Sequence, residues 1–146
     1  DLIYEYGEEK FSRRIAKKIV ERRRESPVRT AAELAELVRS CIPKTRGPDR
    51  IDPATRTFQA LRIAVNEELK SLDIALRRIP DRLAEGGRLA IISFHSLEDR
   101  RVKNAFRDDD RLEVLTRKPI VPGEREETEN PRSRSSKMRV AIKIGR

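Results

Sequence analysis

The only histidine of the chain, His95, follows a short apolar run and precedes Ser96 and Asp99. An imidazole titrates near neutral pH, so it can accept or release a proton during a reaction. Open α/β sheets bind ligands beyond the carboxyl ends of their parallel strands, which is where this junction would lie. We therefore predict that His95 is a catalytic residue. The alternative is a histidine that orients its own loop through hydrogen bonds to Ser96 or Asp99.

The residues around His95 predict a turn, a strand and a helix, in that order. The glycine pair at 86–87 tolerates the backbone angles of a helix stop and a turn. The nearly continuous apolar run over 89–94 is typical of a strand that is covered on both faces. Ser96 with Asp99 resembles a capping box, in which the serine oxygen accepts an N–H group of the next helical turn.

The composition indicates a folded and basic chain. Its 146 residues include 34 Lys and Arg against 25 Asp and Glu, which gives a net charge of +9. This excess favours a polyanionic partner such as nucleic acid, although the basic surface of a soluble protein would give the same count. Charged residues make up 40% and hydrophobic residues 36%, and the apolar residues are patterned. We therefore expect folded segments joined by exposed loops.

Several classes of protein are excluded by simple counts. Cys41 is the only cysteine, so the chain has no disulfide framework and no cysteine-rich metal site, and we predict no bound metal. No apolar run reaches the length of a membrane span, and no signal peptide is visible. We predict a cytoplasmic protein without membrane contact. Because the chain begins at Asp1 in mid-pattern, we expect a fragment or a processed product.

Residues 7–24 predict an amphipathic helix, because Phe11, Ile15 and Ile19 form an apolar stripe. Its other faces are strongly basic. Phosphate contacts by such side chains give an affinity for nucleic acid that does not depend on sequence. We predict four contacts with RNA on this helix: Arg13, Arg14, Lys17 and Lys18. The alternative is a solvated face that nearby glutamates balance.

Two more helices are predicted before the glycine pair. Thr30 and Glu33 form a second capping-box pattern, which begins a short helix. Residues 42–53 hold three prolines and a glycine and are the best linker candidate. Asp52 is a candidate N-cap with Pro53 at the first helical position. Apolar residues at spacings of three and four, from Phe58 to Ile79, then predict one long helix that Pro80 ends.

Two strands are predicted after the helix that follows His95. Residues 111–117 carry apolar side chains less regularly, and residues 118–136 form a long loop rich in Pro, Glu, Ser and Arg. Residues 137–144 alternate strictly, as a half-buried strand does. The apolar members of this alternation are Met138, Val140, Ile142 and Ile144.

Three segments resemble one enzyme family. They are 56–69 (RTFQALRIAVNEEL), 86–100 (GGRLAIISFHSLEDR) and 129–139 (ENPRSRSSKMR). They occur in the order found in the bacterial small-subunit rRNA cytosine-N4 methyltransferases, the MraW or RsmH family. The opening residues 6–16 are also similar to that family. The resemblance spans essentially the whole chain.

The resemblance implies an enzyme that uses S-adenosylmethionine to methylate the exocyclic amine of a cytidine in small-subunit (16S) rRNA. It implies an α/β fold, a Rossmann-like class I methyltransferase domain interrupted by a helical cap domain. This chain resembles the C-terminal half only, with residues 1–50 as part of the cap and residues 51–146 as the C-terminal half of the Rossmann-like domain. The family's glycine-rich cofactor loop is absent here. We expect no cofactor-binding residues in this chain and no activity from it alone.

In this class of methyltransferase the last two strands form an antiparallel pair. Strand 111–117 then runs parallel to strand 88–94, so the connector 118–136 leaves the sheet at the same edge as His95. Arginine suits phosphate contact, because its guanidinium is a planar fork of donors. The predicted RNA contacts at this edge are Ser96, Asp99, Arg100, Asn130, Arg132 and Arg134. The alternative is a solvated, mobile connector.

Strand 88–94 lacks the neighbour that the family places beside it, and an open strand edge seeks a partner. We expect self-association or pairing with the missing N-terminal half. Two other functions stay open. A non-catalytic basic RNA-binding module would lack a glycine-rich segment upstream, and a structural or assembly fragment would fail to bind RNA at low salt.

Overall fold

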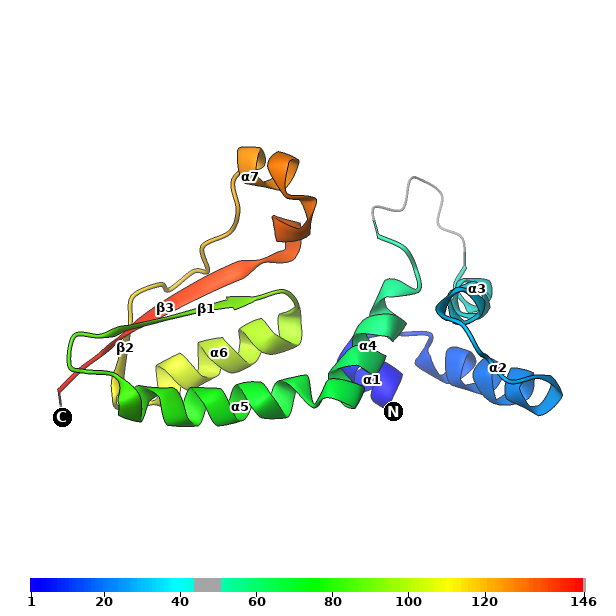
Figure 1. The fold of residues 1–146 in the computed structure, drawn as a ribbon, viewed down its shortest axis with the longest axis horizontal. Coiled ribbons are helices and arrows are strands. Elements are labelled where there is room, and N and C mark those ends of the chain that lie inside the picture. Colours follow the sequence, from blue (N-terminus) through cyan, green and yellow to red (C-terminus); the bar gives the residue numbers. More distant parts are fainter. Residues whose placement is uncertain (44–50, 146) are drawn as a thin grey trace. The chain divides into compact units, whose positions relative to one another are not determined.

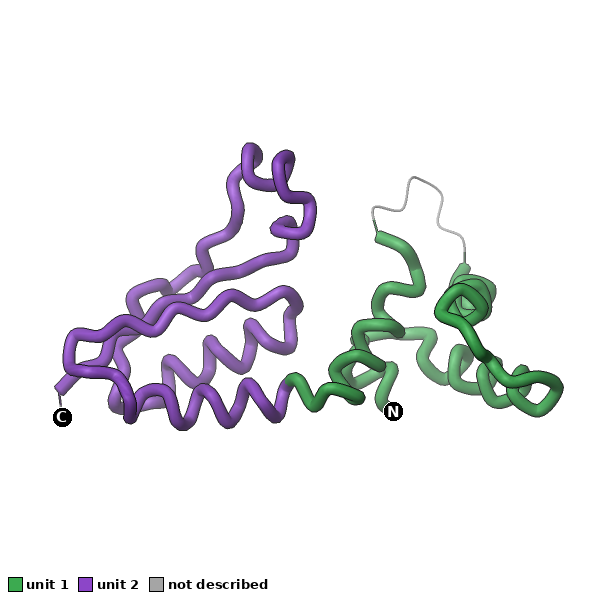
Figure 2. Tube along the Cα trace, in the orientation of Figure 1, with its two compact units in different colours: residues 1–68 green, residues 69–146 purple. Residues whose placement is uncertain are grey.

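A computed structural model describes residues 1–43 and 51–145 of the chain. It divides into two compact units, residues 1–68 and 69–146 (Figure 2). The chain is a mixed α/β protein that is mostly helical and has a small sheet (Figure 1), which agrees with the predicted class. The Rossmann-like and cap-domain assignments, with their boundary at residue 50, stay predictions. Most of the predicted linker lies outside the described residues.

The first unit is helical. It contains α1 (Leu2–Gly7), α2 (Ser12–Glu25), α3 (Ala31–Cys41) and α4 (Thr55–Asn66). Its core includes Ile3, Ile15, Leu37, Val38 and Cys41. The helix predicted over 7–24 begins too early, because the chain turns at Glu8 with a left-handed φ of 49°. The buried Glu9 carboxylate accepts the N–H of Phe11 at 2.8 Å and holds this turn.

Gly7 lies where α1 approaches the backbone of α4. A methyl group on its Cα would lie 2.6 Å from the Arg56 carbonyl oxygen. We expect Gly7→Ala to lower the free energy of unfolding by about 1–3 kcal/mol, the usual cost of overpacking. Urea denaturation followed by the fluorescence of Tyr4 and Tyr6, both in α1, measures this change. Gly123→Ala, where the added methyl meets nothing within 4 Å, is the control. Equal effects of the two variants would contradict the close packing.

The helix starts in this unit agree in part with the predicted ones. The Thr30 hydroxyl accepts the N–H of Glu33 at 3.2 Å, which confirms the predicted cap of α3. The Glu33 carboxylate reaches back to the N–H of Arg29 at 2.8 Å. Asp52 accepts the N–H of Ala54 at 2.8 Å, so it caps a turn that precedes α4 and not the helix itself.

The single long helix predicted from Pro53 to Ile79 is two helices, α4 and α5 (Glu68–Arg78). Between them, Glu67 adopts a left-handed φ of 49° and its N–H donates to the Ile63 carbonyl. The Glu68 carboxylate accepts a hydrogen bond from Arg62 at 2.8 Å. The spacing of apolar residues continues across the break, so periodicity alone does not reveal it.

The second unit contains a three-stranded sheet. After α5 come η1 (Ile79–Arg82), β1 (Arg88–Ser93), α6 (Ser96–Asp108), β2 (Leu112–Val114), α7 (Glu124–Glu129), η2 (Pro131–Ser135) and β3 (Lys137–Lys143). The strand order is β1-β3-β2, and β3 is antiparallel to both neighbours. β1 and β2 therefore run parallel, as predicted. β2 is shorter than the predicted strand 111–117. The predicted loop 118–136 contains α7 and η2, because helical turns begin after Gly123 and at Pro131.

The two faces of the sheet are covered unequally. The face toward α6 carries Leu89, Arg139 and Ala141, whose exposed fractions are 8%, 7% and 0%. On the other face, Ile92 is 56% exposed and pairs with the half-buried Met138. The prediction that β1 is covered on both faces is therefore wrong for the described chain. Packing against α6 buries the less apolar side of β3, which the alternation of residues cannot show.

Candidate active-site rim

The end of β1 and the start of β3 lie side by side. Ser93 is opposite Lys137 in the antiparallel pair, so the loop into α6 and the connector into β3 leave the sheet at one edge (Figure 1). We call this edge the rim and define it by residues 94–99 and 130–137. The structure brings the two predicted groups of site residues together there. Their chemical roles stay predictions.

His95 is the N-cap of α6. Its Nδ1 accepts the N–H of Glu98 at 3.3 Å, and its side chain is 6% exposed. A ring nitrogen that accepts a hydrogen bond carries the lone pair, so a neutral His95 has its proton on Nε2. Nε2 lies 3.5 Å from a carboxylate oxygen of Glu98. The loop-orienting alternative names Ser96 or Asp99 as partners, whereas these contacts of the ring are with Glu98. An orienting role and proton transfer by His95 both stay predictions.

The capping box at this junction differs from the predicted one by one residue. The Glu98 carboxylate accepts the N–H of Phe94 at 2.9 Å, while the N–H of Glu98 bonds to His95. These two residues cap α6 in place of Ser96 and Asp99, so that part of the prediction is wrong. Histidine is not among the preferred N-cap residues, and the commoner serine pattern next to it hides the true cap. Sequence reasoning missed Glu98 for the same reason.

Asp99 forms an ion pair with Arg139 on the inner side of the rim. The carboxylate accepts hydrogen bonds from Arg139 Nε at 2.7 Å and from a terminal nitrogen at 3.1 Å. The exposed fractions of the two side chains are 13% and 8%. Arg139 holds the pKa of Asp99 below its ordinary value, although burial acts in the other direction. Because both oxygens of this carboxylate accept hydrogen bonds from Arg139, a contact of Asp99 with RNA would require this ion pair to open.

Two carboxylates of the second unit make its stability sensitive to acid. Hydrogen bonds from Arg139 and Arg111 lower the pKa values of Asp99 and Asp109, respectively. Such a group stabilises the fold above its unfolded pKa of about 3.9, and that stability is lost as the pH falls through the lower folded value. We expect the urea midpoint, followed by circular dichroism, to fall below about pH 5. Asp109→Asn should flatten the fall, and an unchanged slope would contradict this.

The connector presents its arginines to solvent. Arg132 and Arg134 are exposed, and Arg134 Nε lies 3.9 Å from a Glu127 carboxylate oxygen. Between them, Ser133 is buried and its hydroxyl donates to the Asn130 carbonyl at 2.8 Å. The connector is thus a folded turn that carries guanidinium groups on its outside. On α6, Arg100 is exposed as well.

In the first unit, α2 carries a second group of exposed cations. The predicted contacts Arg13, Arg14, Lys17 and Lys18 are all exposed. Lys17 Nζ lies 4.0 Å from a Glu21 carboxylate oxygen, a surface pair that contributes little. A groove of about 410 Å³ is lined by three of these cations and by residues of α3. Solvated cations along one helix suit the phosphates of a nucleic acid.

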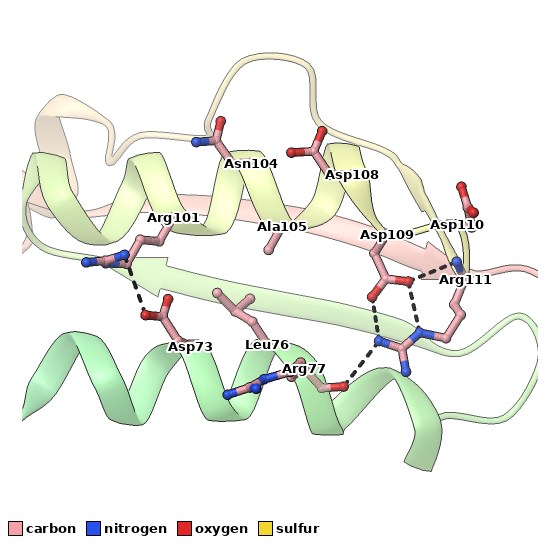
Figure 3. Close-up of a pocket in the computed structure, with 10 residues that line it drawn as sticks. All are labelled: Asp73, Leu76, Arg77, Arg101, Asn104, Ala105, Asp108, Asp109, Asp110 and Arg111. Carbon is pink, nitrogen blue, oxygen red and sulfur yellow. Dashed lines mark hydrogen bonds and ion pairs between the residues drawn. The ribbon is translucent and has the colours of Figure 1, made fainter.

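A cavity of about 620 Å³ lies between α5 and α6 and not at the rim (Figure 3). Several of its charged groups bond to one another. Arg111 donates to Asp109 at 2.6 Å and to the Arg77 carbonyl at 3.1 Å. The carboxylates of Asp109 and Asp81 raise the pKa of Arg111. Arg101 lies 3.5 Å from Asp73 across the cavity. None of the predicted site residues lines it, so we attribute it to the packing of the two helices.

The family of this chain follows from comparison with known proteins. Residues 1–144 match the model of the MraW methylase family. The chain belongs to this family. It is 60% identical over 145 residues to the "Ribosomal RNA small subunit methyltransferase H" of Rhodopirellula baltica, covering 99% of this chain and 44% of that protein. Proteins of the same name from Gloeobacter violaceus and Synechococcus elongatus are 61% and 58% identical over 144 residues, covering 99% of this chain and 44% and 48% of their own lengths.

This MraW family chain matches the C-terminal part of those relatives. It spans less than half the length of the curated relatives that it matches. In the part of the chain that the structure describes, no helix combines the length and apolar character that crossing a membrane requires.

Proposed function

We propose that this chain is the C-terminal part of an enzyme that uses S-adenosylmethionine to methylate the N4 amine of a cytidine in small-subunit rRNA. The observation that carries the proposal is the rim. In a family whose relatives are named as rRNA methyltransferases, the loop of His95 and the arginine connector leave the sheet at one edge. A single-stranded segment of RNA bound there would have its phosphates near guanidinium groups.

Methyl transfer to an amine requires a fixed nucleophile and a route for the proton that the amine loses. We assign the first task to the rim: Arg132 and Arg134 bind phosphates, and the His95–Glu98 cap holds the loop in one conformation. The imidazole of His95 is 6% exposed and its Nδ1 is used in the cap. We therefore propose that water accepts the proton that the amine loses, and that His95 orients the loop.

The residues of this chain do not fit the methyl donor. In residues 1–43 and 51–145, no glycine-rich loop follows a strand; Gly86 and Gly87 precede β1, which runs into α6 through the His95 cap. The N-terminal part of the relatives, which this chain does not cover, would hold S-adenosylmethionine. This chain would bind and orient the RNA.

The open side of the sheet would be the contact with that N-terminal part. β1 is an edge strand, and Ile92 and Phe94 are 56% and 51% exposed. An apolar strand with unpaired backbone groups on one side favours association. Self-association of the isolated chain, seen by light scattering and reversed by the separately expressed N-terminal part, is the expected behaviour.

The test uses the N-terminal part of the Rhodopirellula baltica relative joined to residues 1–146, which we call the completed protein. It should transfer a labelled methyl group to unmodified small-subunit rRNA, and mass spectrometry should locate the label on N4 of a cytidine. By calorimetry, the chain alone should not bind S-adenosylmethionine. Micromolar binding by the chain alone would show that the donor site is misplaced. A completed protein that binds rRNA without methylating it would favour a non-catalytic RNA-binding module.

The cations of α2 should contribute to RNA affinity through counterion release. Replacing Arg13, Arg14, Lys17 and Lys18 by glutamine removes four exposed charges. We expect the slope of log affinity against log salt concentration to become shallower by about 3, since each lost phosphate contact contributes about 0.7. Filter binding of the completed protein to rRNA at several salt concentrations measures the slope. An unchanged slope would mean that this face of α2 is only solvated.

A further inference from the structure

The Asp99–Arg139 pair combines burial, charge and two-point geometry. Both side chains are less than 15% exposed, and two nitrogen–oxygen contacts of 2.7 and 3.1 Å join them. A guanidinium bonded twice to a carboxylate fixes both the distance and the angle between the groups. Lys17–Glu21 and Arg125–Glu129, by contrast, are surface pairs within single helices.

Stability alone does not account for buried charges at this place. Removing two charges from water is costly, and a well-packed apolar pair of similar volume is often as stable or more stable. A second buried polar group on the inner side of the rim, the hydroxyl of Ser93, supports the same conclusion. The hydroxyl of Ser93, the last residue of β1, is 1% exposed and, in the described part of the chain, has no hydrogen-bond partner. Polar groups at the inner side of the rim are thus retained at a cost to stability.

The pair joins the two halves of the rim. Asp99 lies in the first turn of α6, directly after the His95–Glu98 cap, and Arg139 lies near the start of β3, directly after the connector. The two residues are 40 positions apart in the sequence. The two halves are also joined by the pairing of β1 with β3, in which Ser93 is opposite Lys137. The ion pair therefore adds a side-chain connection next to a backbone connection.

We propose that Asp99 and Arg139 are positioning residues, which set the connector arginines and the His95 loop at a fixed separation so that a phosphate and the target base are bound together. This inference rests on the proposed function. It assigns no contact with RNA to either residue. Displacement of a positioning group by about 1 Å can lower a rate about 100-fold. Replacing both partners by well-packed apolar residues should therefore affect the reaction more than the fold.

The test replaces the pair by apolar side chains in the completed protein, as Asp99→Leu with Arg139→Met. We expect an unchanged or raised melting temperature and a single-turnover methylation rate about 100-fold lower. Because the apolar pair could pack poorly, Asp99→Asn with Arg139→Gln is a second variant. It keeps one neutral hydrogen bond, and its rate should fall about tenfold.

The outcomes separate the inference from the proposed function. A folded variant that methylates at the unchanged rate would overturn the positioning role while leaving the methyltransferase intact. If the unsubstituted completed protein does not methylate rRNA, the proposed function fails and this inference fails with it. A rate that falls only in proportion to a lower melting temperature would also overturn it, since that is what a merely structural pair would do.

Discussion

Replacing Arg132 and Arg134 together by glutamine is expected to lower rRNA methylation by the completed protein about 100-fold. Both side chains are exposed on the connector, and the carboxylate 3.9 Å from Arg134 is too distant to hold it firmly. Two charge-assisted hydrogen bonds of about 1.5 kcal/mol each make about 3 kcal/mol, which corresponds to about two powers of ten in binding of the transition state. The value of kcat/KM with unmodified rRNA measures the effect.

A matched control removes the same charge from the same connector. Lys118 and Arg125 are also exposed, and Arg125 is bonded to Glu129 within α7. Replacing these two by glutamine should lower kcat/KM by less than about threefold, since they lie outside the rim. If both double variants lose activity equally, the connector acts through its net charge and not through Arg132 and Arg134. If neither loses activity, the connector is solvated and does not contact RNA.

Arg139→Ala is expected to destabilise the second unit by about 3–5 kcal/mol, the largest stability effect that we predict. The substitution leaves the carboxylate of Asp99, a buried residue of α6, without its two-point partner. Lys137, whose Nζ is 4.0 Å from the same carboxylate and whose side chain is 43% exposed, can compensate only in part. Native-state hydrogen exchange of the β3 amides reports on this unit without contribution from the first.

Arg125→Ala is the control for this prediction, because its side chain is 89% exposed and its pair with Glu129 is a surface pair. Its cost should be at most about 0.5 kcal/mol. Comparable protection of the β3 amides in the two variants would mean that the carboxylate of Asp99 is hydrated and the pair is not buried in solution. Asp99→Ala should be less costly than Arg139→Ala if the remaining guanidinium reaches solvent along its longer side chain.

Local features of the fold could be predicted because neighbouring residues produce them. The Thr30 cap depends on a residue three positions away, and the strand pattern of 137–144 depends on alternation alone. The start of α6 was predicted to within one residue for the same reason. Local patterns do not decide between two adjacent candidate N-caps. His95 and Ser96 each have an acidic residue three positions later, Glu98 and Asp99 respectively.

The rim could also be predicted, although by a longer argument. The direction of three strands places the loop of His95 and the arginine connector at one edge, and the register of Ser93 against Lys137 confirms this. The burial of each side chain there could not be predicted. The sequence predicts that Asp99 contacts RNA, and it does not reveal the pair with Arg139, which lies 40 positions further along the chain.

The residues alone were sufficient to locate the helices, the strands and the shared edge, because periodicity, caps and strand direction are local or additive properties of a chain. Contacts between distant segments settled the rest. They bury the less apolar side of β3, and they pair Asp99 with Arg139. Both results depend on which surface another element covers. Burial changes the free-energy cost of a charged group far more than the residues next to it in the sequence do.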